Sequence, residues 1–441
     1  MLFAQYGLHV ILLGLLIVIR RATMQFDSVS AHSKNTEQIQ TGDFMTDFSA
    51  PLAGIRVLDL STAIAGPHAS GLMADQGADV IKIETPGVGD IMRYVGAQKD
   101  GVSAMFQNAN RGKRSITLNL KTEAGKDIIR KLLVECDVLV HNFRIGVMEK
   151  LGLGFEQLHK EFPQLVYLSV YGYGHSGPRS SMRAYDNVVQ CFAGVAKTQA
   201  NIETGEPIYA FQVISDKLTA LTGFQALTAA LLARERQSCG GQHIQLSMVD
   251  TTVAFLWMDA SGAATFLDEG AAEGASVAKG NKLMQFKNGW GCCAPLSDDE
   301  FHGVCRAFGV DSSDPKLASA LDRNINIDAM IGKMAEVQEK ALLVDVDEAI
   351  ARMDAEDVPC SKANELADLP NEPQIQANGT FVKSVHPVAG NIQEPRPPAQ
   401  FSKTSAAIQG PCPLLGQHTE EILVGLGLGE ELPALREQGV V

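Results

Sequence analysis

The stretch that decides the fold is Gly54–Asp90, which reads GIRVLDLSTAIAGPHASGLMADQGADVIKIETPGVGD. An apolar run ends at Asp59, and small residues with Gly66-Pro67 then open a helix, where Pro67 suits the first turn. A second apolar strand, Ala78–Glu84, follows at once, and Pro86-Gly87 ends it. Two buried parallel strands joined by a short helix predict an open α/β sheet. Ligands of such a sheet bind beyond the carboxyl ends of its strands, and the N–H groups at the helix start favour an anion such as a phosphate.

The same alternation of apolar strands and helices continues through residue 248. Short apolar runs predict strands at 138–140, 165–170 and 244–248, and helical periodicity predicts helices at 122–135, 218–234 and 250–266. The pattern predicts one doubly wound, Rossmann-like α/β domain over residues 45–260.

The sequence pattern changes after residue 277. Asn288-Gly289 lies between two apolar segments and predicts a hairpin turn. Ser297 with Glu300 three residues later predicts a capping box, and Gly309 ends the helix that follows. We therefore expect a smaller α+β domain over 277–362. The proline-rich remainder, 363–441, is expected to hold no regular helix and to return as a loop-rich segment along the surface of the large domain.

Composition limits the class of function. The chain has 441 residues, of which 45% are hydrophobic, so it can bury a large core in two domains. A net charge of −14 argues against nucleic-acid binding, which needs a basic surface. Eight scattered cysteines are typical of reduced thiols in the cytoplasm, and the histidines show no metal-ligand spacing. The chain also lacks a GxSxG elbow and a P-loop.

Residues 1–44 do not share the pattern of the rest. Gly7–Ile19 is apolar and is followed by two arginines, but it is short for a membrane span and has neither a basic start nor a small-residue cleavage site. We interpret 1–44 as a non-domain N-terminal extension, with a real membrane anchor as the alternative.

Several segments in their order resemble one family. Gly54–Asp90 is followed by NRGKRSITLNLK (110–121), DVLVHNFRIGVMEKLGLG (137–154), YLSVYGYGHSGP (167–178), RAYDNVVQ (183–190) and LLGQHTEEIL (414–423). Together they resemble the class III CoA-transferases, a superfamily that includes formyl-CoA transferase, carnitine CoA-transferase and the α-methylacyl-CoA racemases. The resemblance implies a homodimer of interlocked chains, a CoA thioester as substrate and no tightly bound cofactor.

The resemblance also assigns a nucleophile. Local sequence alone favours a structural role for Asp216, as a carboxylate at a helix start, where the helix dipole favours its ionised form. In the family, the aspartate at this place, after a turn such as Gly205-Glu206-Pro207, attacks the acyl-CoA. The resemblance thus implies an aspartyl anhydride and then an aspartyl-CoA thioester. The oxyanion donors are expected near a glycine-rich loop, where this chain has only Gly280, Gly289 and Gly291.

Tyr185 and Asp186 are the expected substrate-binding residues. The racemases have histidine at the place of Tyr185, as one of two acid/base groups, and tyrosine is a poor base near neutral pH. This favours CoA transfer over an acyl-CoA racemase or isomerase. A second alternative, a non-catalytic acyl-CoA-binding or membrane-anchored protein, is suggested only by residues 1–44.

CoA contacts carried over from the family fall near the carboxyl ends of the predicted strands. Phe143 is expected to stack on adenine, and the basic side chains are expected to meet phosphates. Thr85 stands where formyl-CoA transferase has arginine, so we expect that phosphate contact either to be missing or to be replaced by Arg93 or Arg111. The full set is Ala63, Ile64, Leu118, Asn119, Lys121, Asn142, Phe143, Arg144, Lys150 and Arg183.

Overall fold

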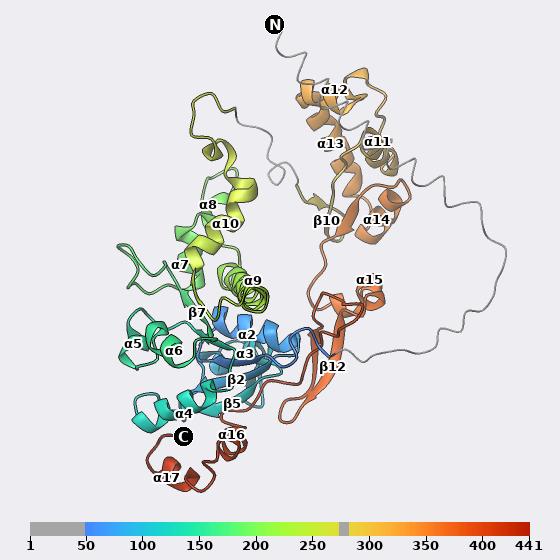
Figure 1. Ribbon diagram of the computed structural model, residues 1–441. Coiled ribbons are helices and arrows are strands. Elements are labelled where there is room, and N and C mark those ends of the chain that lie inside the picture. The colour runs from blue at the N-terminus through green and yellow to red at the C-terminus, as the bar shows by residue number, and fades with distance from the viewer. Residues whose placement is uncertain (1–48, 273–281) are drawn as a thin grey trace, which may run out of the picture. The chain divides into compact units, whose positions relative to one another are not determined.

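The computed structural model describes residues 49–272 and 282–441 (Figure 1). The N-terminal extension predicted at 1–44 and the candidate oxyanion residue Gly280 lie outside the described residues. No helix in the described ranges is long and apolar enough to cross a membrane.

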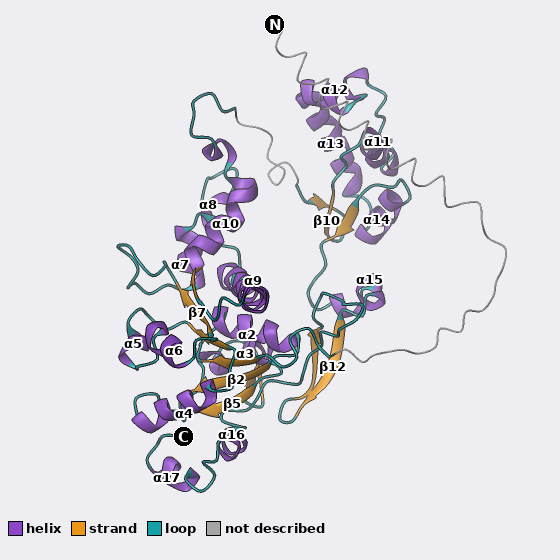
Figure 2. Ribbon diagram, viewed as in Figure 1, coloured by secondary structure: helices purple, strands orange, loops and turns teal. Residues whose placement is uncertain are grey.

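Six parallel strands form the central sheet, in the order β5-β2-β1-β6-β7-β8 (Figure 2). From the centre of the sheet, β1, β2 and β5 follow one another toward one edge, and β6, β7 and β8 follow one another toward the other edge. This is the doubly wound arrangement. The predicted α/β class is therefore confirmed. The strands are β1 (Arg56–Asp59), β2 (Asp79–Glu84), β5 (Arg114–Thr117), β6 (Val138–His141), β7 (Val166–Tyr171) and β8 (His243–Ser247).

Both faces of the sheet are covered by helices because neighbouring strand residues point to opposite sides. Val57 packs with α2 (Ala65–Asp75), α9 (Ile214–Gln237) and α10 (Met248–Ala260), whereas Leu58 packs with α4 (Glu123–Leu133) and α6 (Phe155–Glu161). Figure 1 shows α2 and α9 on one side of the sheet and α4 on the other. The remaining helices of this region are η1 (Ile91–Tyr94), α3 (Ala104–Asn110), α5 (Val147–Lys150), α7 (Asp186–Phe192), α8 (Val195–Thr198) and η2 (Gly262–Thr265), with the short strand pair β3 (Gln98–Lys99) and β4 (Val102–Ser103).

Residues 284–362 have a hydrophobic core of their own. The predicted hairpin is present, with Trp290 opposite Gln285, and Ser297 and Glu300 form the predicted capping box of α11 (Asp298–Ala307). Gly309, at φ 64°, follows the end of that helix. The other elements are β9 (Met284–Gln285), β10 (Trp290–Cys293), η3 (Pro315–Leu317), α12 (Ala320–Ile325), α13 (Ile327–Ala341), α14 (Val346–Asp354) and β11 (Cys360–Lys362).

The C-terminal segment is more regular than its prolines predict. The expectation of a loop without regular helix is wrong, because Pro373 occupies the first position of a helix, where its missing N–H costs nothing. The segment contacts the large α/β region through hydrogen bonds such as Arg111 Nη1 to the Pro395 carbonyl, at 2.8 Å. Its elements are η4 (Leu369–Asn371), α15 (Pro373–Ala377), the hairpin β12 (Phe381–His386) and β13 (Gly390–Pro395), α16 (Thr419–Gly425) and α17 (Leu432–Glu437).

Candidate active site

The site begins where the strand order reverses, between β1 and β6. The chain leaves β1 and β6 toward opposite edges of the sheet, so the loops after these strands diverge and leave a crevice. Two hydrogen bonds tie the loops together at its edge. The Thr62 N–H donates to Asn142 Oδ1 at 2.9 Å, and Asn142 Nδ2 donates to the Thr62 carbonyl at 2.7 Å.

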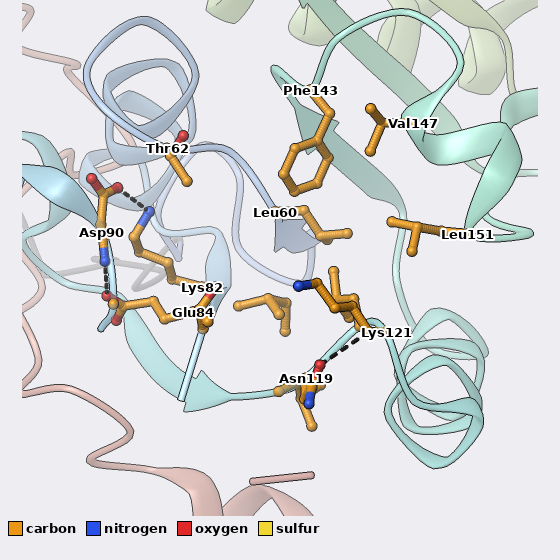
Figure 3. A pocket seen from close by; sticks show the side chains of 15 residues that line it. Leu60, Thr62, Lys82, Glu84, Asp90, Asn119, Lys121, Phe143, Val147 and Leu151 are labelled. Carbon is orange, nitrogen blue, oxygen red and sulfur yellow. Dashed lines mark hydrogen bonds and ion pairs between the residues drawn. The ribbon is translucent and has the colours of Figure 1, made fainter. Parts of the chain in front are cut away.

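A pocket of about 250 Å³ lies at this carboxyl edge of the sheet (Figure 3). Figure 3 shows the Phe143 ring pointing into it above Leu60, while the Lys121 amino group reaches in from the side of Asn119. The pocket thus offers an aromatic ring and a lysine amino group, which suit an aromatic base joined to phosphates. Its lining residues are Leu60, Thr62, Lys82, Ile83, Glu84, Thr85, Gly89, Asp90, Leu118, Asn119, Leu120, Lys121, Phe143, Val147 and Leu151.

A buried ion pair supports one wall of the pocket. Lys82 Nζ lies 2.9 Å from Asp90 Oδ2, and both side chains are fully buried. Burial alone would lower the pKa of Lys82, but the carboxylates of Asp59 and Asp90 outweigh that effect and raise it. Asp90 in turn accepts the Ala63 N–H at 3.1 Å. Because Ala63 has the unusual φ of 67°, this bond helps hold a strained loop at the pocket rim.

Neither arginine considered as a replacement for the missing phosphate contact is free for that role. Arg93 makes two hydrogen bonds to Glu84, at 2.8 and 2.6 Å. Arg111 makes two to Asp75, at 2.9 and 2.7 Å. Each guanidinium is already neutralised by a bidentate carboxylate partner, so the expectation that Arg93 or Arg111 meets a phosphate is not supported.

Asp216 lies in the first turn of α9, against the start of α2. Burial and the charge of Asp186 raise its pKa to about 7, although the Ala65 backbone N–H that faces the carboxyl group opposes the shift. The helix start favours the ionised form of this carboxylate, but other effects are larger. Burial and Asp186 outweigh the helix dipole, whose effect is small.

The loop between β1 and α2 connects the pocket to Asp216. Thr62 lines the pocket, and Ala65, three residues later, faces the Asp216 carboxyl group. Three residues span at most about 11 Å, so the two places lie within the reach of one elongated ligand.

Asp186 is a structural partner of Asp216. It is 8% exposed, and its Oδ1 accepts the Asp216 backbone N–H at 3.0 Å while its Oδ2 accepts from Gln190 Nε2 at 2.6 Å. Gln190 also bonds the backbone of Ala210, so this pair fixes the segment that enters α9. Tyr185, by contrast, is 67% exposed and makes no side-chain hydrogen bond to Asp186 or Asp216. The sequence analysis expected both Tyr185 and Asp186 to bind substrate. In the structure Asp186 is buried against Asp216, whereas the Tyr185 side chain is exposed.

The structure brings only part of the predicted CoA set together. Leu118, Asn119, Lys121 and Phe143 line the pocket. Ala63, Ile64 and Asn142 lie in the two loops at its rim. The remaining three, which are Arg144, Lys150 and Arg183, are exposed and do not line it.

Comparison with known proteins identifies the family. The family model described as CoA-transferase family III matches residues 52–419. The chain belongs to this family.

Two relatives illustrate the range of activities in the family. Over 392 residues the chain is 31% identical to succinyl-CoA:glutarate CoA-transferase of Mus musculus, and the match covers 86% of each chain. It is 29% identical over 425 residues to formyl-CoA:oxalate CoA-transferase of an Escherichia coli strain, with 89% of this chain and all of the relative covered. The family III membership supports CoA transfer in general.

Solved structures agree with this assignment. A CaiB/BaiF family protein from Brucella suis superposes with a TM-score of 0.75 at 29% identity, covering 86% of this chain and 100% of that protein. A hypothetical protein from Mycobacterium tuberculosis gives a TM-score of 0.73 at 28% identity, covering 85% and 99%.

Sequence reasoning missed the buried ion pair. The signal was visible as Lys82 in the middle of the apolar strand DVIKIE, since a lysine with apolar neighbours on a central strand must find a carboxylate. Asp90, eight residues later, is that partner.

Proposed function

We propose that the protein moves CoA from an acyl-CoA donor to a free carboxylic acid, with Asp216 as the nucleophile. One observation carries the assignment within the family. Asp216 is a part-buried carboxyl group that faces the N–H of Ala65, and Ala65 follows Thr62, which lines a pocket suited to CoA, by only three residues. A pKa of about 7 leaves a substantial ionised fraction at neutral pH and makes the ionised form more basic than an ordinary aspartate.

The proposed reaction has four transfers at carbonyl carbon. An ionised oxygen of Asp216 attacks the thioester carbonyl of the donor, the C–S bond breaks, and CoA leaves as the thiolate. That thiolate attacks the Asp216 carbonyl of the anhydride and expels the donor acid as a carboxylate. The acceptor carboxylate then attacks the aspartyl-CoA thioester and releases the thiolate again. In the last step the thiolate attacks the acceptor acyl carbonyl, which forms the new acyl-CoA and restores the Asp216 carboxylate.

The described residues suggest how the site supports these steps. The Ala65 N–H faces the Asp216 carboxyl group, so it is placed to stabilise negative charge that develops there. Lys121 and Phe143 are proposed to hold the phosphates and the adenine of CoA. Asp186 is proposed to set the pKa and the position of Asp216 rather than to contact the substrate.

A trapping experiment tests the nucleophile. With the unmodified protein and an acyl-CoA donor alone, hydroxylamine should convert one carboxyl group to a hydroxamate, and peptide mass spectrometry should locate it at Asp216. The Asp216→Ala variant should fold and bind CoA but exchange no acyl groups. Labelling at Asp186 instead, or substantial exchange by the alanine variant, would show that the nucleophile is misassigned. A matrix of acyl-CoA donors against free acids, scored by mass spectrometry for new thioesters, would identify the substrates.

We further propose a cytoplasmic homodimer of interlocked chains. Support for a dimer comes from large apolar side chains exposed on α10 and just after it, among them Phe255 (51%), Met258 (93%) and Leu267 (100%). All eight cysteines are free, which agrees with a reducing compartment. Light scattering after size exclusion should give twice the chain mass, and a monomer that is fully active would contradict the proposal.

A further inference from the structure

Three polar side chains form a continuous chain of hydrogen bonds across β6, β7 and β8. His141 ends β6, Ser169 lies in β7 and His243 begins β8. The Ser169 hydroxyl lies 2.8 Å from His141 Nε2 and 2.9 Å from His243 Nε2. We call this set the histidine–serine chain.

The chain of hydrogen bonds is buried within an aromatic layer. His141 is 2% exposed and Ser169 is fully buried. The His141 ring meets the edge of Tyr167 at 5.2 Å, and Tyr167 meets His243 at the same centroid distance. His141 and Ser169 must therefore find their hydrogen-bond partners within the protein, because water does not reach them, whereas His243 is part-buried.

The hydrogen bond to Phe143 decides which nitrogen of His141 carries the proton. His141 Nδ1 accepts the backbone N–H of Phe143 at 3.2 Å, so the ring proton of neutral His141 must be on Nε2. Nε2–H then donates to the Ser169 oxygen, which also lies within hydrogen-bond distance of His243 Nε2. Burial and the charge of His243 lower the pKa of His141 to about 3, so its ring stays neutral through the usual pH range.

The bond to Phe143 links this buried chain to the pocket. Phe143 is the second residue of the loop after β6, and its ring is one of the groups that point into the pocket (Figure 3). It also stacks on His141, with ring centroids 6.1 Å apart and planes inclined by 21°. Both its backbone and its ring therefore rest on the same histidine.

We infer that His141, Ser169 and His243 are positioning residues that hold Phe143 ready for the CoA end of the substrate. The inference rests on the proposed function, because it takes the pocket to be the CoA site. None of the three residues lines the pocket, so they act through Phe143. Preorganising a contact residue improves binding because less conformational entropy is lost when the ligand arrives.

Replacing Ser169 with alanine tests the inference. His141 Nε2–H then has no acceptor, and the alternative tautomer would turn a ring N–H toward the N–H of Phe143. The loop should loosen, and the Kd for free CoA measured by calorimetry should rise about fivefold, the factor that matches one net hydrogen bond. The KM for the acyl-CoA donor should rise by a similar factor while kcat stays within about twofold.

Two variants serve as controls. Ser169→Thr keeps the hydroxyl and should restore the affinity of the unmodified protein. Tyr167→Phe removes another buried hydroxyl from the same strand, one that donates to the Leu153 carbonyl at 2.9 Å, without touching Phe143. It should lower thermal stability and leave the Kd for CoA unchanged. Equal loss of affinity in Tyr167→Phe and Ser169→Ala would mean that the effect is general destabilisation, and would overturn the inference.

The tautomer of His141 can be measured directly by nuclear magnetic resonance, without a ligand-binding assay on any variant. With ¹⁵N-labelled histidine, the imidazole signals of His141, assigned by their loss in His141→Gln, should show a protonated Nε2 and an unprotonated Nδ1 between about pH 6 and 8. The opposite tautomer would overturn the inference even if Ser169→Ala failed to fold. If the unmodified protein binds no CoA, the proposed function fails as well. If it binds CoA and Ser169→Ala binds equally well, only the positioning role fails.

Discussion

Replacing Asp216 with asparagine should abolish CoA transfer and at the same time stabilise the protein near pH 8. Asparagine is close in shape and keeps an oxygen that can face the Ala65 N–H, but it carries no charge. The variant therefore removes the nucleophile and also removes the repulsion between two neighbouring carboxylates.

The size of the effect follows from the pKa of Asp216, which is raised from 3.8 to about 7. A shift of about three units corresponds to about 4 kcal/mol of unfavourable free energy for the ionised form. Asp216 is partly exposed, and solvent screening reduces this figure to about 2 kcal/mol. For a chain of this size the asparagine variant should melt roughly 2–5 °C higher at pH 8.

The raised pKa of Asp216 also determines how the stabilisation by Asp216→Asn should change with pH. A carboxyl group whose pKa is higher in the folded state than in the unfolded state destabilises the fold fully above the folded value, near 7. This cost falls as the pH drops from 7 toward 3.8, because the group is then protonated in the folded protein. The difference in free energy of unfolding between variant and unmodified protein should therefore be about twice as large at pH 8 as at pH 5.5.

The assay is thermal or chemical unfolding of both proteins across this pH range, together with the rate of acyl exchange. Asp250 provides a matched control, since it occupies the same third position of a helix, α10, but is exposed. Asp250→Asn should change stability by a few tenths of a kcal/mol and keep activity. An Asp216→Asn variant that is less stable than the unmodified protein at pH 8, or equally stable at every pH, would refute the reasoning.

Three further outcomes are expected. With Asp186→Asn, the acid limb of the kcat/KM profile, set by ionisation of Asp216 near pH 7, should move to lower pH, because a neighbouring negative charge is gone; an unchanged limb would contradict the coupling. Lys82→Met should cost about 3–5 kcal/mol in urea unfolding by leaving Asp90 unpaired, and the double variant with Asp90→Leu should recover much of it. Deuterium exchange at the α-carbon of a chiral 2-methylacyl-CoA should be negligible, and Tyr185→His alone should not create it, since two aligned groups are needed; rapid epimerisation would favour a racemase.

Local patterns were sufficient for most of the α/β framework. Strands β2, β6 and β7 were predicted because buried parallel strands are nearly continuous apolar runs, and strands β1 and β8 were predicted from shorter apolar stretches. The capping box at Ser297 was also visible, since its two hydrogen bonds join residues only three apart. Strand β5 was missed because its sequence, RSIT, holds one apolar residue, and its Ser115 is buried by residues distant in the sequence, among them Glu84 and His418.

The chemical character of the candidate site depended on distant residues. Sequence placed a carboxylate at the start of α9 and predicted an ionised group, which is all that a helix dipole implies. Asp186, thirty residues earlier, and the burial that α2 provides reverse that expectation. In the same way, His141, Ser169 and His243 are isolated polar residues in the sequence, and only the register of three strands makes them neighbours. Apolar periodicity is a short-range signal that a sequence carries by itself, whereas the pKa of a group and its hydrogen-bond partners depend on what the fold places beside it.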